Sequence, residues 1–139
     1  MSKETNKQVM SPFVRFINTA DPQLADQLIS SKAVFHVPGR AEPMVGPQGY
    51  LTIIAMMRSG FPDIQWALDE LILDDDKAAA RFTMTGTHQG TFFGVPPTGK
   101  QIRVKAINIY HFLNGQIIEE YGQPDLLGLM QQIGALPPQ

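Results

Sequence analysis

The first third of the chain has apolar residues at helical spacing. One stripe of a first helix is formed by Val9, Phe13, Phe16 and Ile17. Pro12 suits a first-turn position, so this helix either begins or bends there. Asp21 followed by Pro22 is typical of a helix start and predicts a second, short helix through Ile29. We expect residues 1–8, which are mostly polar, to be frayed.

A strand and a third helix follow in the sequence. Residues 33–37 have the apolar, β-branched character of a strand, and Pro38-Gly39 is expected to end it. A helix is predicted over residues 47–61 because apolar side chains recur there on one face. That face is formed by Tyr50, Ile54, Met57 and Phe61.

Alternating patterns dominate the second half of the chain. Four strands are predicted, at residues 64–73, 78–88, 102–113 and 116–121. The acidic segment 74–77 separates the first two strands, and Asn114-Gly115, a strong hairpin signal, separates the last two. A final short helix is predicted from Pro124 to Ile133. This order predicts an α+β fold, with helices on one face of a curved, mostly antiparallel sheet.

The two-residue period of a strand predicts which side chains share a face. In strand 78–88 the buried face is expected to carry Ala80, Phe82, Met84, Gly86 and His88. In strand 102–113 Asn108 and Tyr110 fall on the more apolar face, where a polar atom needs a partner or a ligand. The opposite face combines charged residues with Ile107 and Ile109. Because exposed isoleucine rows are uncommon, this face is predicted to form a homodimer.

The last strand is ambiguous. Its two alternating sets are Ile117, Glu119 and Tyr121 on one face, and Ile118, Glu120 and Gly122 on the other. Each set combines an apolar residue with a glutamate, so the pattern leaves open which set is interior.

Length and composition limit the alternatives. A chain of 139 residues predicts a single domain spanning residues 1–139. The absence of cysteine excludes disulfides, thiolate metal sites and cysteine nucleophiles. A net charge of −2 and an isoelectric point near 5.8 give no basic surface for nucleic acid. No apolar run reaches the length of a membrane span, and no signal-type segment begins the chain, so we expect a cytoplasmic protein.

One motif has to be set aside. Residues 94–100 match the first part of a phosphate-binding P-loop, G-x-x-x-x-G-K. Gln101 stands where that loop needs serine or threonine, and Pro96 and Pro97 lack the backbone N–H groups that bind phosphate. No nucleotide site is therefore expected.

Two further segments carry a family resemblance. With Thr85-Gly86-Thr87-His88-Gln89-Gly90 and Pro124-Asp125-Leu126-Leu127-Gly128-Leu129, the chain resembles the SnoaL-like polyketide cyclases over about residues 45–135. These proteins are related to nuclear transport factor 2 and ketosteroid isomerase. The resemblance implies a cone-shaped barrel, in which the curved sheet wraps around three N-terminal helices and a short helix closes the chain.

The resemblance also implies catalytic residues. Asp125 corresponds to the family's acid/base, although an acidic residue in a first helical turn also stabilises the helix dipole. His88 belongs to the T-G-T-H-x-G pattern and is either a structural residue or a donor to a developing enolate. A substrate-binding set is expected at His36, Phe82, Met84, Trp66, Asn108, Tyr110 and Tyr121. For the apolar members, core packing is the alternative.

The implied reaction is an intramolecular aldol condensation that closes a ring of an aromatic polyketide ester. A carboxylate removes a proton next to a carbonyl, and hydrogen-bond donors stabilise the enolate. The expected substrate is a small apolar or aromatic carbonyl compound, and no cofactor is required. The three histidines lack the spacing of a metal site, so no metal is expected. The alternatives are another isomerase, hydratase or hydrolase, and a non-catalytic, dimeric ligand-binding domain.

Overall fold

A strongly curved sheet dominates the computed structural model, which describes residues 3–137. Within these residues the sheet has six strands in the order β2-β1-β6-β5-β4-β3. The strands are β1 (Ile29–His36), β2 (Met44–Val45), β3 (Gln65–Asp74), β4 (Lys77–Thr87), β5 (Gln101–Leu113) and β6 (Gln116–Pro124). Only the pair β1–β6 is parallel among the paired strands described.

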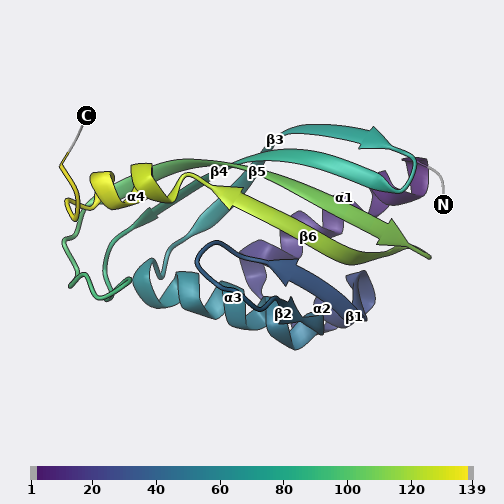
Figure 1. The fold of residues 1–139 in the computed structure, drawn as a ribbon, viewed down its shortest axis with the longest axis horizontal. Coiled ribbons are helices and arrows are strands. Elements are labelled where there is room, and N and C mark those ends of the chain that lie inside the picture. Colours follow the sequence, from purple (N-terminus) through teal and green to yellow (C-terminus); the bar gives the residue numbers. More distant parts are fainter. Residues whose placement is uncertain (1–2, 138–139) are drawn as a thin grey trace.

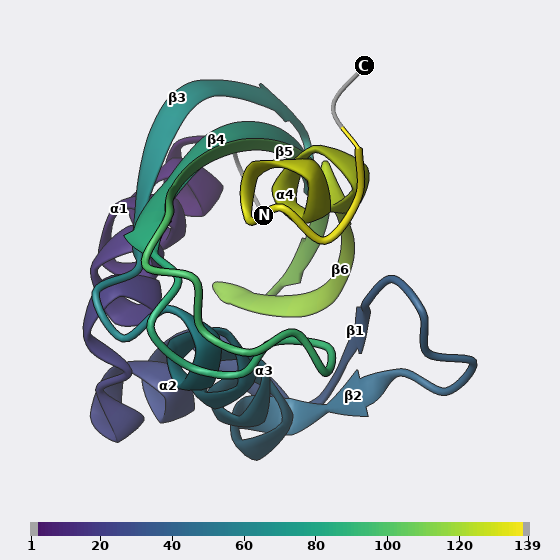
Figure 2. The same ribbon diagram turned by 90° about the vertical axis from the view of Figure 1, so that its left-hand side faces the viewer.

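Helices close the side of the sheet that the strands leave open. They are α1 (Lys3–Thr19), α2 (Pro22–Leu28), α3 (Gly46–Gly60) and α4 (Leu126–Gln132). Figure 2 shows the sheet curling from β3 round to β6 and β1, with α1, α2 and α3 on the remaining side. The α+β fold predicted from the sequence is confirmed. No helix among residues 3–137 is both long and apolar enough to cross a membrane.

The first helix is longer than the sequence predicts. It begins at Lys3 and continues through Pro12, so residues 3–8 are helical where a frayed terminus was expected. Asn6 explains part of the extension, because its side chain is buried and donates to the Asp75 carbonyl at 2.6 Å. This bond attaches the first turns of α1 to the β3–β4 turn. Residues 1 and 2 lie outside the described part of the chain.

The end of α1 is fixed to the start of β3. The Asn18 side chain donates to the Trp66 carbonyl at 3.0 Å and accepts from the Trp66 N–H at 2.7 Å. Directly after α1, the backbone of Ala20 adopts a left-handed conformation, with φ 57°. Paired bonds of this kind satisfy the backbone of an edge strand. They also hold the Trp66 side chain at a set position.

A short helix covers the edge that β6 leaves open. The last pair of the β5–β6 ladder joins Ala106 to Pro124, so earlier residues of β5 lack a strand partner on that side. Gln132 of α4 takes this place, accepting from the Arg103 N–H at 2.7 Å and donating to the Arg103 carbonyl at 2.9 Å. Figure 1 shows α4 at the same end of the molecule as the segment between β4 and β5.

The strand predictions agree with the structure to within one residue, apart from three larger differences. β1 begins at Ile29, four residues earlier than expected, and β6 extends beyond Tyr121 to Pro124. β2 was not predicted, because two residues give no alternating pattern. It forms by pairing with Val34 and Phe35 of β1.

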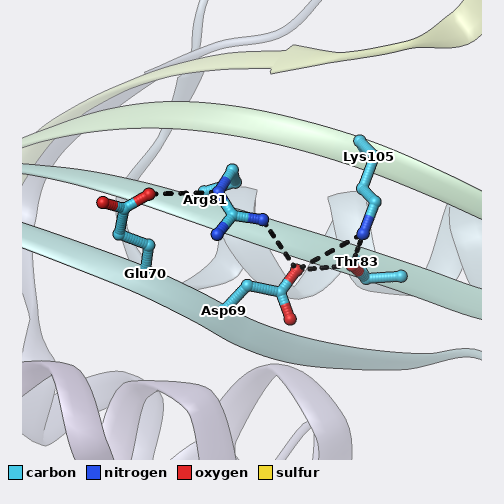
Figure 3. A network of polar contacts seen from close by, with 5 residues as sticks. All are labelled: Asp69, Glu70, Arg81, Thr83 and Lys105. Carbon is cyan, nitrogen blue, oxygen red and sulfur yellow. Dashed lines mark hydrogen bonds and ion pairs between the residues drawn. The ribbon is translucent and has the colours of Figure 1, made fainter.

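The outer face of the sheet carries a network of charged side chains. Asp69 lies 3.7 Å from Arg81 and 3.8 Å from Lys105, and Thr83 donates to the same carboxylate (Figure 3). Arg81 also pairs with Glu70 at 3.2 Å. The hydrogen bond from Thr83 and the nearby positive charges lower the pKa of Asp69.

Aromatic side chains fill the interior between α1, α3 and the sheet. Phe13 meets the rings of Tyr50 and Tyr110 edge to face, each at a centroid distance of 5.4 Å. Phe35 packs on Tyr50 from β1 at 4.7 Å. Such edge-to-face pairs fix the ring orientations in addition to burying apolar area. Phe13 therefore sets the positions of two phenol groups.

Replacing Phe13 with alanine should lower the free energy of unfolding by about 3–5 kcal/mol, because the side chain is fully buried and leaves a cavity. Urea denaturation measures this change. The matched control is Phe93→Ala, since Phe93 is 62% exposed and its loss should change stability by no more than about 0.5 kcal/mol. Equal losses in the two variants would contradict the packing described.

Candidate active site

A largely apolar cavity of about 570 Å³ lies inside the curved sheet. Its walls come from β3, β4, β5, β6 and α3, together with the β1–β2 loop and the segment after β4. Ligand sites in proteins are commonly concave, apolar and roughly 300–1,000 Å³ in volume. Of the predicted site residues, Trp66, Met84 and Asn108 line this cavity.

Glu120 provides a carboxyl group in the cavity wall. Its residue is 4% exposed, and the Tyr50 hydroxyl donates to Oε2 at 3.1 Å. Tyr110 forms a second hydrogen bond with the same carboxyl. Burial raises the pKa of Glu120 to about 7, and the two tyrosine hydrogen bonds oppose the increase. Near neutral pH this carboxyl is thus divided between its protonated and ionised forms.

The two tyrosines stay protonated under the same conditions. Burial and the adjacent Glu120 raise the pKa of Tyr50 and of Tyr110 well above the ordinary value. Both hydroxyls can therefore act as permanent donors to the carboxylate. Tyr110 lies behind the cavity wall and does not line it, whereas Tyr50 does.

Asn108 continues this hydrogen-bond chain. Its Nδ2 donates to the Tyr110 hydroxyl at 3.2 Å, and its Oδ1 accepts from the Gln123 N–H at 3.1 Å. The backbone bond fixes which side of the amide carries the nitrogen. Nδ2 has a second N–H, for which the described residues supply no acceptor. This N–H is available to a carbonyl oxygen in the cavity.

The alternating pattern of β6 leaves Glu120 unassigned because this strand contains a bulge. Leu113 pairs with Gln116 and Phe112 with Ile117, but His111 then pairs with Glu119. A regular hairpin would have placed Glu119 opposite Tyr110. The extra residue, Ile118, places Glu120 there instead and turns its side chain inward. The sequence signal for a polar group at this position is the pair Asn108 and Tyr110, which lies on the more apolar face of the neighbouring strand.

The bulge leaves Glu119 on the outer face of the sheet. There its Oε2 lies 2.8 Å from Nε2 of His36, and the hydrogen bond from His36 lowers the pKa of Glu119. The His36 ring stacks on Tyr121 at 4.4 Å. His36 and Tyr121, both expected to bind substrate, thus lie outside the cavity lining.

Phe82 and His88 are buried but do not line the cavity. Phe82 belongs to the main apolar core. His88 fixes the segment after β4: its Nδ1 accepts from the Thr98 N–H at 3.2 Å and lies 2.9 Å from the Thr98 hydroxyl oxygen. Its Nε2 has no hydrogen-bond partner among the described residues. The side-chain hydrogen bonds of His88 thus go to Thr98, in the segment between β4 and β5.

Asp125 occupies the start of α4. Its side chain accepts from the Gly128 N–H at 2.9 Å, and the residue is exposed. Pro124 and Leu126 line the cavity, but Asp125 does not. The observed contact is therefore the helix cap that was the alternative interpretation of this residue.

No metal centre is apparent in the described part of the chain, which contains no suitable group of three or more His, Asp or Glu side chains. The P-loop-like segment 94–100 leads directly into strand β5. This arrangement lacks the helix that a P-loop requires.

Comparisons with known proteins identify the family. The SnoaL-like polyketide cyclase model matches residues 7–133. Aklanonic acid methyl ester cyclase AcmA of Streptomyces galilaeus is 29% identical over 101 residues, covering 70% of this chain and 69% of that protein. Nogalonic acid methyl ester cyclase of Streptomyces nogalater is 23% identical over 91 residues, covering 64% and 67% respectively.

Solved structures agree over nearly the whole chain. TsrD from Streptomyces laurentii has a TM-score of 0.85 and 29% identity, with coverage of 98% of this chain and 99% of TsrD. IdmH from Streptomyces antibioticus has a TM-score of 0.83 and 26% identity, with coverage of 93% and 98%. These similarities confirm the cone-shaped version of the fold. The chain belongs to the SnoaL-like polyketide cyclase family.

Proposed function

We propose that the protein catalyses a cofactor-independent intramolecular aldol condensation of an aromatic polyketide, with Glu120 as the general base. The observation that carries this proposal is a buried carboxyl in the wall of an apolar cavity, with a pKa of about 7. A base of this pKa is half ionised at neutral pH and still strong enough to remove a proton from an activated carbon.

The proposed reaction needs one proton-transfer group. Glu120 removes a proton from the carbon next to a carbonyl, and the resulting enolate carbon attacks a second carbonyl carbon of the same molecule. The new alkoxide then takes the proton back from the Glu120 carboxyl. One carbon–carbon bond forms, the attacked carbonyl becomes a hydroxyl, and no oxidation or reduction occurs.

The neighbouring groups would assist this cycle in two ways. Tyr50 and Tyr110 orient the carboxyl through their hydroxyl groups. The second N–H of Asn108 is a donor for the enolate oxygen, where charge develops. The apolar walls, including Trp66 and Met84, would hold the two reacting carbons close together.

Asp125 is the alternative base, as the family resemblance implies. Its exposed capping position gives it no direct place in the cavity wall, whereas Glu120 is part of that wall. The two carboxyls can be compared by amide substitutions. Asparagine at position 125 keeps an oxygen that accepts from the Gly128 N–H, so the helix cap is preserved.

Glu120→Gln should lower kcat by about 10²–10⁴-fold, because it removes general base catalysis without changing the side-chain volume. Asp125→Asn should retain activity close to that of the wild type. Cyclisation of aklanonic and nogalonic acid methyl esters, followed by chromatography, compares the variants on whichever ester the wild type converts. The reverse order of losses would assign the chemistry to Asp125, and retained activity in both variants would refute both assignments.

The titration of Glu120 can be tested without a substrate. The pKa of Glu120 is raised in the folded protein. As pH rises, the folded protein therefore keeps this proton at pH values where the unfolded chain, with a glutamate pKa of about 4.3, has already lost it. Stability should therefore fall as pH rises from about 4.3 to 7. Between pH 5 and pH 8 the decrease should be about 2–3 kcal/mol relative to Glu120→Gln. Urea denaturation of both proteins measures it, and parallel pH profiles would contradict the buried carboxyl.

We also propose that the outer face of the sheet forms a homodimer. The strand register places Ile72, Ala79, Ile109 and Tyr121 in one row across β3 to β6. Ile107, which is 55% exposed, lies on the same face. Asp69, Glu70, Arg81 and Lys105 on this face already pair with one another (Figure 3), so these four charges need no partner from a second copy. A two-fold interface requires such a self-complementary surface.

Ile109→Asp should convert this dimer to a monomer, because it places a charge in the middle of the apolar row. Light scattering coupled to size-exclusion chromatography measures the mass. Leu127→Asp is the matched control, since Leu127 is an exposed residue of α4 outside that row. A monomeric wild type, or a dimer unaffected by Ile109→Asp, would refute the interface.

A cytoplasmic location and the absence of nucleic-acid binding stay predictions from the sequence.

A further inference from the structure

The cavity has two charged residues among those that line it in the described chain, Glu120 and Arg40. They differ sharply in exposure, since Glu120 is buried and Arg40 is exposed. The carboxyl therefore belongs to the interior and the arginine to the mouth. The other lining residues are apolar, glycine or uncharged polar residues.

The Arg40 guanidinium has no partner in the described part of the chain. No hydrogen bond or ion pair joins it to any described residue, including Glu42 two positions along the same loop. By contrast, Arg58 of α3 donates to the Asn18 carbonyl, and Arg81 is paired with Asp69 and Glu70. Arg40 thus keeps its full set of donors for a ligand.

The loop that carries Arg40 starts from a fixed position. His36, the last residue of β1, pairs with Tyr121 in the parallel ladder and bonds to Glu119 on the outer face. The loop then turns at once, with the Arg40 N–H donating to the Val37 carbonyl at 3.4 Å. Figure 1 shows the loop leaving β1 at the end of the strand that lies beside β6.

We propose that Arg40 binds an anionic oxygen group of the substrate, so that the cavity takes an aromatic carboxylic acid in preference to the neutral ester. Guanidinium and carboxylate form paired, charge-assisted hydrogen bonds that an ester cannot reproduce. The aromatic body would occupy the apolar walls. The carbon to be deprotonated would lie near Glu120, with the acid group at the mouth. This inference rests on the proposed function only in taking the cavity as the substrate site.

The distinction matters because AcmA and its relative from Streptomyces nogalater are named as methyl ester cyclases. An ester presents no charge to an arginine. A free acid presents one, and the guanidinium would offset its desolvation at the cavity mouth. The inference therefore predicts a substrate class that those names do not include.

Trp66 allows the preference to be measured directly. It is the single tryptophan of the chain and lines the cavity, so its fluorescence reports occupancy. The probes are anthraquinone-2-carboxylate and its methyl ester, titrated at pH 8 with inner-filter correction into the full-length protein. Wild-type protein should bind the acid at least about tenfold more tightly than the ester.

Arg40→Gln should weaken binding of the acid by about tenfold and leave binding of the ester unchanged. Arg15→Gln is the matched control, because Arg15 is exposed on α1 and does not line the cavity. It should behave as the wild type. Equal wild-type affinities for acid and ester, no binding of the acid, or equal losses for both probes in Arg40→Gln would overturn the proposal.

Glu120→Gln separates this proposal from the catalytic one. It should keep the preference for the acid, since the arginine is untouched, even where turnover is lost. If Glu120→Gln is fully active and the acid preference persists, the base assignment fails and the Arg40 assignment stands. If turnover depends on Glu120 and the wild type shows no acid preference, the base assignment stands and the Arg40 assignment fails.

Discussion

The hydrogen bonds from Tyr50 and Tyr110 to the Glu120 carboxyl are the contacts on which the interior depends. A carboxyl buried without donors would be strongly unfavourable in either protonation state. With two phenols beside it, the group stays polar and titrates near neutral pH, while the walls around it stay apolar. The carboxyl also depends on the cavity, because filling the cavity would leave the carboxyl without access to a reactant.

The elements of the fold have clear tasks in maintaining this arrangement. α3 supplies Tyr50 and β5 supplies Tyr110, and Phe13 of α1 packs edge to face on both rings. Asn108 extends the chain of hydrogen bonds to the backbone of β6 at Gln123. A side chain from each layer thus contributes to one polar cluster. Rigid support of this kind is what a preorganised catalytic group requires.

The sequence predicts the helices and long strands well because their patterns are local. It predicts the shared face of Asn108 and Tyr110 for the same reason, since period two holds along an unbroken strand. It fails at Glu120 because a bulge is set by pairing between strands and leaves no mark in the alternation of β6. It also places His36 and Tyr121 at the cavity, because local spacing does not reveal on which side of a curved sheet a residue lies.

The adjacent glutamates of β6 show how far the environment, rather than residue type, determines chemistry. Glu119 is partly exposed beside His36, and its pKa is lowered by that hydrogen bond. Glu120 is enclosed by apolar walls and phenols, and its pKa is raised to about 7. One residue of register decides which glutamate has which surroundings. Without the bulge, Glu119 would point inward and Glu120 outward, although the sequence of the strand would be the same. The register of β6 is therefore itself a functional property of this fold.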